Sequence, residues 1–299
     1  MAEGSPMHVF ITGGTGLIGS AVVAELLANG HTVLALTRSD ASAQAAEQAG
    51  AEPLRGSLAD LDVLRAGAAR ADGVIHLAFS NDFSSPEALA QGVAEESAAL
   101  AALGEALAGS GRPLVTVAGT PYIPGRASTE ADPLSTAGPV GGRGRSVTAA
   151  LELASRGVRS TAVRMPRTVH NNGTGGFAGL LTAIARRSGV SGYPGDGEQR
   201  WPAVHALDAA VLFRLALEQA EAGTSWHAVA DEGDRVRDIA TVIGSRLNLP
   251  VEAVPTESFG TLGQIFATDQ PSSSVHTRQA LGWEPKHPSL LEDLENIQA

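Results

Sequence analysis

Three glycines stand three residues apart in the stretch ITGGTGLIGS, between an apolar run and a segment with helical spacing. They are Gly13, Gly16 and Gly19. A tight glycine turn lets the backbone approach a pyrophosphate, and the N–H groups that open the helix add partial positive charge. The strand before the turn and the helix after it are the context that this motif requires. The pattern predicts a dinucleotide-binding turn; the alternative is a tight strand-to-helix turn without a ligand.

The end of the second apolar run, LALTRSD, bears on the choice of cofactor. An enzyme that uses NAD carries an acid here, which accepts hydrogen bonds from the ribose hydroxyls. Thr37 stands at the expected place, followed by Arg38 and Ser39. A guanidinium suits a 2′-phosphate, so we predict NADP(H) over NAD(H). NAD(H) stays possible, because Asp40 could turn toward the ribose and Arg38 could be a solvated loop residue.

Strands and helices alternate through the first half of the chain. Short β-branched apolar runs predict strands, and longer runs with helical spacing predict helices. The predicted strands are 8–12, 32–36, one around Leu54, 73–79, 113–119 and 160–166. The predicted helices are 16–30, 40–49, 58–69, 86–108 and 144–156. Strands separated by helices imply right-handed crossovers, so the predicted fold is α/β, a Rossmann-type doubly wound parallel sheet.

Composition narrows the classes of partner. The chain has 299 residues, enough for one large or two small domains, and a net charge of -11, which argues against nucleic acid and anionic membranes. It has no cysteine, which excludes disulfides and thiol catalysis. No run approaches the ~20 apolar residues of a membrane span, and the first residues are short and polar for a secretory signal. We expect a cytoplasmic protein that binds a small-molecule substrate.

Several further motifs occur in a fixed order along the chain. They are TGGTGLIG at 12–19, GSL at 56–58, HLAF at 76–79, VRMPRTVH at 163–170, RWPAVHALDAA at 200–210 and LGWEPKHPSLLEDL at 281–294. In this order they resemble the extended short-chain dehydrogenase/reductase family, which includes sugar-nucleotide epimerases and dihydroflavonol-type reductases. The resemblance covers nearly the whole chain.

The resemblance implies where the cofactor lies. The GSL segment corresponds to Gly-Asp-Leu beside the adenine, so Ser57 in place of the aspartate weakens or removes one hydrogen bond. The backbone after the sixth strand corresponds to the segment that meets the nicotinamide. The implied cofactor residues are Gly13, Thr15, Gly16, Leu17, Ile18, Gly19, Arg38, Ser39, Ser57, Leu58, Leu77, Ala78, Phe79, Ala118, Pro166, Thr168 and Val169.

The resemblance also implies the domain organisation. Residues 7–169 correspond to the dinucleotide-binding domain, and a return segment at about 203–228 re-enters it. Residues 170–299 form mostly a smaller C-terminal substrate-binding part. Family members often pair through helices equivalent to 86–108 and 144–156, so a homodimer is possible.

One departure from the family concerns catalysis. The family's catalytic tyrosine, and the lysine four residues later, would fall at Gly144 and Thr148, and no Tyr-x-x-x-Lys occurs anywhere in the chain. The sequence therefore resembles an atypical branch that lacks the pair. General acid catalysis contributes typically ~10²–10⁴-fold, so its loss lowers the rate without forbidding reaction. A substrate that is already protonated, such as an iminium ion, needs no strong acid.

Four residues are candidates for the remaining chemistry. Thr120 falls where the family has its active-site serine or threonine and could hydrogen-bond a carbonyl; it could also be a turn residue before a proline. Tyr122, two residues further on, could be a displaced proton donor or a packed turn aromatic. Arg143, preferred to Arg145, could stabilise negative charge or sit at a solvated helix end. Histidine is the side-chain type most suited to acid catalysis near neutral pH, so His170 could be the general acid, although a lone histidine after a strand is more often structural.

A second polar pair, His205 and Asp208, is expected to be structural. Asp208 is predicted to cap a helix at 209–221, with His205 packing locally. The remaining histidines and acids show no metal-ligand spacing, so we predict no metal site.

The substrate region is expected to begin at residue 170. Its aromatic residues Phe177, Tyr193 and Trp201 could line a pocket, whereas the later aromatic residues could be core. The predicted function is an NADP(H)-dependent oxidoreductase that reduces a carbonyl or imine-type small molecule by hydride transfer. The alternatives are a non-catalytic dinucleotide-binding redox sensor and an epimerase or lyase that recycles its cofactor.

Overall fold

The computed structural model describes residues 5–80, 85–137 and 141–298. Parallel strands form a seven-stranded sheet in the order β10-β6-β5-β4-β1-β2-β3. The strands are β1 (His8–Thr12), β2 (Thr32–Thr37), β3 (Glu52–Arg55), β4 (Gly73–His76), β5 (Pro113–Gly119), β6 (Arg159–Met165) and β10 (Thr224–His227). The order reverses between β1 and β4, which confirms the doubly wound sheet.

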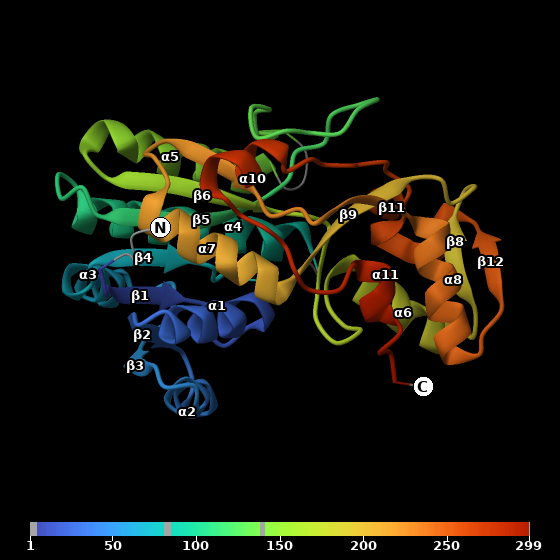
Figure 1. The fold of residues 1–299 in the computed structure, drawn as a ribbon, viewed down its shortest axis with the longest axis horizontal. Helices are drawn as coiled ribbons and strands as arrows, with labels where there is room; N and C mark the ends of the chain where they lie inside the picture. The colour runs from blue at the N-terminus through green and yellow to red at the C-terminus, as the bar shows by residue number, and fades with distance from the viewer. Residues whose placement is uncertain (1–4, 81–84, 138–140, 299) are drawn as a thin grey trace.

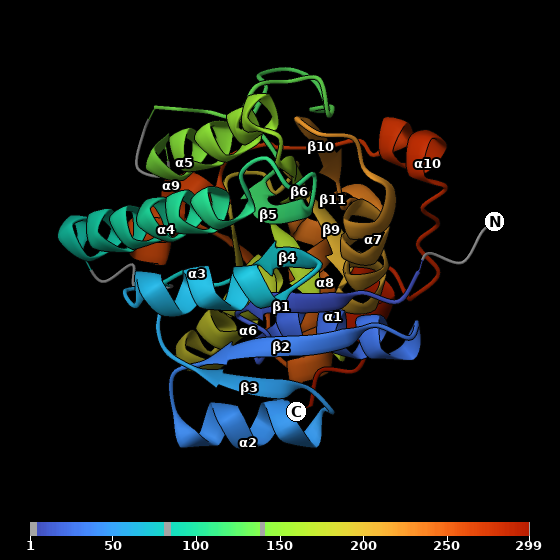
Figure 2. The ribbon, with the colours of Figure 1, turned by 90° about the vertical axis from the view of Figure 1, so that its left-hand side faces the viewer.

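Helices cover both faces of this sheet (Figure 2). Helices α3, α4 and α5 lie on one face, α1 and α7 on the other, and α2 beside the edge strand β3. Their bounds are α1 (Leu17–Ala28), α2 (Asp40–Gln48), α3 (Leu61–Arg70), α4 (Pro86–Leu107), α5 (Gly141–Glu152) and α7 (Ala206–Gln219). Alternate residues of β1 serve the two layers: Val9 and Ile11 pack in the core on the α1 and α7 side, and Phe10 in the core under α3 and α4.

A smaller part of the chain lies at one end of the sheet (Figure 1). It contains a three-stranded sheet in the order β11-β9-β7 and a parallel pair, β8 with β12. The strands are β7 (Thr168–His170), β8 (Ser191–Pro194), β9 (Arg200–His205), β11 (Asp231–Arg235) and β12 (Val251–Val254). The helices of this part are α6 (Gly176–Ser188), α8 (Val236–Leu247), α9 (Gly263–Phe266) and α11 (Leu290–Leu294), with the 3-10 turn η2 (Thr256–Leu262). The 3-10 turn η1 (Leu153–Arg156) and helix α10 (Val275–Leu281) pack against the large sheet and its helices instead.

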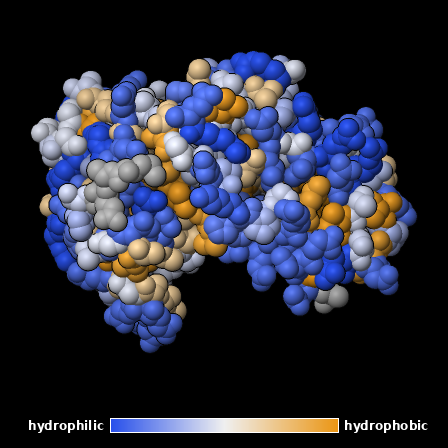
Figure 3. All heavy atoms as spheres, in the orientation of Figure 1, coloured by the Kyte–Doolittle hydropathy of each residue, from blue (hydrophilic) through white to orange (hydrophobic). Residues whose placement is uncertain are grey.

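Most of the aromatic residues of the C-terminal half are core. Trp201, Phe259 and Phe266 are buried together in the smaller part, and Trp283 packs in the core beside α7. Trp201 therefore does not line an open pocket in this conformation. The face of the molecule drawn in Figure 3 is mostly hydrophilic, with apolar residues in separate small groups. No helix within the described ranges is both long and apolar enough to cross a bilayer.

Several predicted boundaries were wrong; helix α3, for example, begins at Leu61 rather than at residue 58. Strand β4 ends at His76 rather than at residue 79, because residues 77–79 turn away and line a cavity. Helix α5 begins at Gly141 rather than at residue 144. Its glycine-rich start packs against the preceding loop, where a Cβ on Gly144 would collide with the Ser135 carbonyl oxygen.

The start of α7 also differs from the prediction. The helix begins at Ala206, and the side chain of His205, not of Asp208, caps it by accepting the Leu207 N–H. Asp208 lies in the first turn and is buried. It accepts the backbone N–H groups of Lys286 and His287, so it anchors the C-terminal segment instead.

Candidate functional site

A cavity of about 640 Å³ lies at the carboxyl ends of the central strands β1, β2 and β4. In a doubly wound sheet this edge is where ligands bind. Nine predicted cofactor residues line it: Gly13, Thr15, Gly16, Arg38, Ser57, Leu58, Leu77, Ala78 and Phe79. Sequence reasoning missed Leu36, Ser42, Gly56, Ala59, Ser80 and Glu95, which also line it. Gly56 could have been found, since it belongs to the same GSL motif as Ser57.

The glycine turn has the shape that a dinucleotide requires. Gly13 has φ +75°, and a Cβ there would lie 2.8 Å from the Ala78 nitrogen. A Cβ on Gly19 would collide with the Gly13 carbonyl, so this glycine lets α1 approach the turn. A Cβ on Gly16 would meet only the Gly13 oxygen, at 3.6 Å. Protein packing therefore does not require a glycine at position 16, and the free space beside it fits a ligand that approaches the backbone.

The amino end of α1 suits an anion. Gly16 is its N-cap and supplies no side-chain hydrogen bond, and the first turn contains no acidic residue. The N–H groups that open this helix are left for a negatively charged group, and the helix dipole favours one there. The residues present therefore fit the pyrophosphate of a dinucleotide.

Arg38 is an exposed cation on the cavity wall. Its guanidinium makes no hydrogen bond or ion pair with the part of the chain that the structure describes. Asp40 pairs instead with Arg55 at 3.2 Å. The hydroxyl of Ser39 accepts the Ser42 N–H and so caps α2. Of the polar side chains directly after β2, Arg38 is thus the one without a partner in residues 5–80, 85–137 and 141–298.

At the far end of the cavity, Ser57 is tied to Asp60. The Asp60 carboxylate accepts both the backbone N–H and the hydroxyl of Ser57, each at 2.8 Å. These hydrogen bonds lower the pKa of Asp60. The Ser57 hydroxyl donates its proton to Asp60, so it can only accept a hydrogen bond from an adenine. This agrees with a weaker contact than the aspartate of the family would make.

The other predicted cofactor residues do not line this cavity. Leu17, Ile18 and Gly19 lie in the first turn of α1 behind the glycine turn, and Ser39 caps α2. Ala118, Pro166, Thr168 and Val169 are buried at the carboxyl ends of β5 and β6 or in β7. They lie further along the same edge of the sheet, where the resemblance implies the nicotinamide.

Thr120 follows β5 at this edge. Its side chain is buried, and its hydroxyl has no hydrogen-bond partner among the described residues. Its backbone is fixed on both sides, because its N–H donates to the Met165 oxygen at 2.9 Å and its carbonyl accepts from Gln270 Nε2 at 2.7 Å. Tyr122, by contrast, is 50% exposed. The geometry favours Thr120 over Tyr122 as a group that meets a substrate.

Buried polar atoms without partners gather at the same strand ends. Most buried polar groups are hydrogen-bonded, so each exception calls for an explanation. Near the carboxyl ends, judged among the described residues, these atoms are His76 Nε2 of β4, Thr120 Oγ1 after β5, Arg164 Nε of β6, Arg167 Nε after β6 and Thr168 Oγ1 of β7; Thr116 Oγ1 is a further one, inside β5. The atoms near the carboxyl ends are those whose hydrogen bonds a ligand at this edge would complete.

An ion pair occupies the helix where the family places tyrosine and lysine. Arg143 of α5 donates from Nε and Nη2 to the carboxylate of Glu96 in α4, at 2.8–3.2 Å. The Glu96 side chain is completely buried, whereas that of Arg143 is 27% exposed. The guanidinium carbon lies 4.0 Å from the ring centre of Phe79, which lines the cavity. Burial, and then the charge of Arg143, lower the pKa of His76 to about 4, so this histidine is neutral at pH 7.

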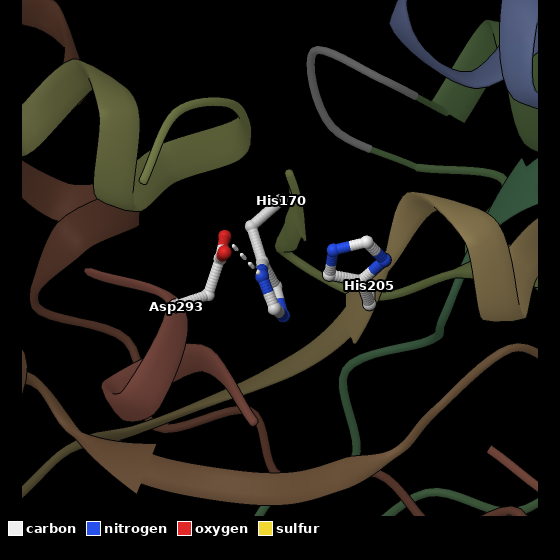
Figure 4. Close-up of side chains that lie close together, drawn as sticks. All are labelled: His170, His205 and Asp293. Carbon is white, nitrogen blue, oxygen red and sulfur yellow. Dashed lines mark hydrogen bonds and ion pairs between the residues drawn. The ribbon is translucent and has the colours of Figure 1, made fainter. Parts of the chain in front are cut away.

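His170 lies in a separate buried cluster with Asp293 and His205 (Figure 4). Its Nδ1 is 2.9 Å from the Asp293 carboxylate, which also accepts the Gly173 N–H. Burial alone would raise the pKa of Asp293, but the hydrogen bonds from His170 and Gly173 lower it. His170 is completely buried and joins β7 to α11. This location favours an anchoring role over the general acid that the sequence suggested.

The spacing of the three side chains would admit a metal ion, since one ligand atom from each lies within 4.8 Å of the others. Their hydrogen bonds argue against one. His205 Nδ1 accepts the Leu207 N–H, which assigns the proton of this ring to Nε2. A ligating histidine normally donates from its second nitrogen instead. The ring of His205 meets that of His170 edge-on, with centres 5.3 Å apart, on the side opposite Asp293 (Figure 4).

Comparison with known proteins agrees with this architecture. The family model described as the NAD dependent epimerase/dehydratase family matches residues 9–229. A protein of Schizosaccharomyces pombe, described as uncharacterized, is 42% identical over 292 residues, covering 96% of this chain and 98% of its own. The 3-diazoavenalumate denitrifying reductase of a Streptomyces species is 29% identical over 307 residues, covering 96% and 99%. The solved UDP-glucose 4-epimerase of Thermotoga maritima superposes with a TM-score of 0.79 at 21% identity, covering 97% of each chain.

Proposed function

The chain belongs to the NAD dependent epimerase/dehydratase family of extended short-chain dehydrogenase/reductase enzymes, and on that premise we propose that it is an NADP(H)-dependent reductase of a carbonyl or imine-type small molecule. The observation that carries the proposal is the Glu96–Arg143 ion pair on the helix that should supply the proton donor. An arginine holds its proton too tightly to act as a general acid at neutral pH. The reaction is therefore one that proceeds without a strong acid from the protein.

Specificity for NADP(H) is attributed to Arg38. A guanidinium on the cavity wall that makes no ion pair with any described residue supports a contact with a 2′-phosphate, which it can hold in a bidentate, charge-assisted pair. Asp40, the carboxylate that would serve an NAD ribose, is occupied by Arg55. The adenine is assigned to the side of Ser57 and Leu58, and the pyrophosphate to Gly13, Thr15 and Gly16.

When bound, the reduced dinucleotide supplies a hydride to the acceptor. Thr120 is assigned to the acceptor, because its buried hydroxyl has no hydrogen-bond partner among the described residues and its backbone is held in place from both sides. A hydrogen bond from this hydroxyl polarises a carbonyl or imine, and water completes the protonation. Arg143 and Glu96 together form a neutral ion pair against the Phe79 ring, so they add a fixed dipole beside the site.

An acceptor that is already electron-poor agrees best with this arrangement. An iminium carbon or a diazonium nitrogen needs no proton from the enzyme when it is reduced. One relative that spans nearly the whole chain is named a 3-diazoavenalumate denitrifying reductase, and it supports this choice of substrate class.

The test is oxidation of NADPH by the purified, cofactor-stripped protein in the presence of ketones, cyclic iminium ions and aryl diazonium ions. The proposal expects oxidation with at least one charged acceptor, and transfer of deuterium from C4-labelled NADPH into its product. Stoichiometric NADPH binding without oxidation by any of them would favour a redox sensor. A dinucleotide retained through purification, with no net oxidation, would favour an epimerase or lyase.

A further inference from the structure

Arg167 is a partly buried cation at the carboxyl end of β6. Its Nη1 donates to the Ile265 carbonyl at 2.8 Å and its Nη2 to Gln270 Oε1 at 2.6 Å. Its Nε is buried and has no partner among the described residues. Burial lowers its pKa to about 10, so it remains charged at pH 7. Arg167 is therefore a partly buried charge whose direct hydrogen bonds go to neutral oxygens, while the Asp269 carboxylate acts on it only through space. A directly bound anion would stabilise this charge further.

This cation lies next to the catalytic candidate. The Thr120 N–H donates to the carbonyl of Met165, two residues before Arg167. Gln270 then bridges the two side by side: its Nε2 donates to the Thr120 carbonyl at 2.7 Å, and its Oε1 accepts from Arg167. A single amide side chain thus separates the guanidinium from the backbone of Thr120.

The surroundings of Arg167 are apolar on one side. Its guanidinium carbon lies 5.4 Å from the ring centre of Phe177. The Phe177 ring meets Trp201 edge-on at 5.8 Å, and the indole N–H of Trp201 is buried without a partner among the described residues. An arginine beside a phenyl ring suits a ligand that joins an anionic group to an apolar body.

We propose that Arg167 binds a carboxylate of the substrate, so that the molecule reduced beside Thr120 carries a free carboxylate on an apolar body; this rests on the reductase function proposed above. The anion is a monoanionic carboxylate rather than a phosphate. Arg167 supplies a single positive charge, and the neighbouring Asp269, although paired with Arg200 at 2.8 Å, adds negative potential. A dianion would need further cations.

The experiment measures binding of benzoate, benzamide and phenyl phosphate to the full chain without cofactor, by quenching of tryptophan fluorescence and by calorimetry. The variants are Arg167→Met, Arg167→Lys and, as the matched control, Arg187→Met, which changes an exposed arginine of α6. Benzoate is expected to bind the unmodified protein, with benzamide and phenyl phosphate weaker. Loss of a charge-assisted contact corresponds to a fall of about 10-fold or more in benzoate affinity for Arg167→Met. Arg187→Met is expected to bind normally.

Arg167 could instead only pin the segment that carries Ile265 and Gln270. A purely structural role predicts equal affinity for benzoate and benzamide, or benzoate affinity that survives in Arg167→Met; either result overturns the proposal, as does preferred binding of phenyl phosphate. If Arg167→Met fails to fold, Arg167→Lys decides. Lysine keeps the positive charge but lacks the two parallel N–H donors of the guanidinium group. Arg167→Lys should therefore weaken benzoate binding several-fold and leave benzamide binding unaffected. Unchanged benzoate binding would overturn the proposal.

The two proposals fail separately. Benzoate binding through Arg167 with no oxidation of NADPH would support the carboxylate site and contradict the reductase function. NADPH oxidation by uncharged acceptors with no preference for a carboxylate would support the reductase function and contradict the carboxylate site.

Discussion

Glu96 and Arg143 form a bidentate ion pair in which the carboxylate is completely buried and the guanidinium covers the ring of Phe79. The pair joins α4 to α5, and Arg143 directly precedes Gly144, the position at which the family resemblance places the catalytic tyrosine. The pair gives the site a fixed dipole and no mobile proton.

Removing one partner of this pair is expected to be costly. Arg143→Met leaves the buried Glu96 carboxylate uncompensated and should lower the free energy of unfolding by about 3 kcal/mol or more. The double variant Glu96→Gln/Arg143→Met should recover a large part of this loss, because it buries no unpaired charge. Urea denaturation of the unmodified protein, Glu96→Gln, Arg143→Met and the double variant measures the coupling energy between the two side chains. Strictly additive losses of stability would show that the pair does not act as a unit.

Variants of Thr120 and Thr116 distinguish a hydroxyl that contacts the substrate from one that only packs in the core. Thr120→Ala is expected to lower turnover by roughly 10- to 100-fold with unchanged NADPH affinity, because a hydrogen bond to the acceptor is lost. Thr116→Val is the matched control, since its hydroxyl is also buried without a partner among the described residues but lies inside β5. It should keep turnover. Equal turnover in both variants would remove Thr120 from the site.

The Asp293–His170 contact is expected to support stability rather than turnover. Asp293→Asn should lower the free energy of unfolding by roughly 1–3 kcal/mol, because the buried donors of His170 and Gly173 lose their charged acceptor. Asp196→Asn, at an exposed turn, serves as the control. NADPH affinity and turnover should be retained. A loss of turnover of about 10²-fold or more in folded His170→Gln would restore His170 as a general acid.

Asp234 is expected to make stability depend on pH. Burial, reinforced by Asp231 and Asp238, raises its pKa from 3.8 to about 6. Between these values the folded protein holds a proton that the unfolded chain has released, so stability falls as the pH rises through this window. One pKa unit corresponds to about 1.4 kcal/mol, so Asp234→Asn should stabilise the protein by roughly 1–3 kcal/mol at pH 8 and hardly at all near pH 4.

Chemical denaturation at the two pH values checks this, with Asp62→Asn, a fully exposed position, as the reference. A pH-independent effect of Asp234→Asn would contradict the assignment.

Local patterns explain which parts of the fold were predicted from sequence. Strands β1 and β5 were placed to the residue, because apolar β-branched runs bounded by turn residues are a local signal. The end of β4 was missed because residues 77–79 leave the strand to line the cavity, a choice imposed by the neighbouring glycine turn. The start of α5 was missed because its glycines respond to packing against a loop that precedes them.

The lining of the cavity was predictable only where the sequence motif is contiguous. The glycine turn and Arg38 lie on the cavity wall as expected, because the signal for each is contained in a few neighbouring residues. Glu96 is 47 positions from Arg143, and Asp293 is 123 positions from His170. No pattern in the neighbouring sequence marks Glu96 or Asp293 as a partner. Whether Arg143 and His170 are held in ion pairs or are free to act in catalysis is therefore decided only by the folded structure.

Calorimetric titration of the cofactor-stripped protein with NADPH and then NADH tests directly whether the glycine turn and Arg38 hold NADPH. NADPH is expected to bind more tightly than NADH. Arg38→Ala is expected to weaken NADPH binding by about 10- to 100-fold and to leave NADH binding unchanged, since only the contact with the 2′-phosphate is lost. Arg70→Ala, which removes an exposed arginine paired with Glu52, should change neither. Equal affinity for the two cofactors would contradict the role of Arg38, and binding of neither would contradict the reductase itself.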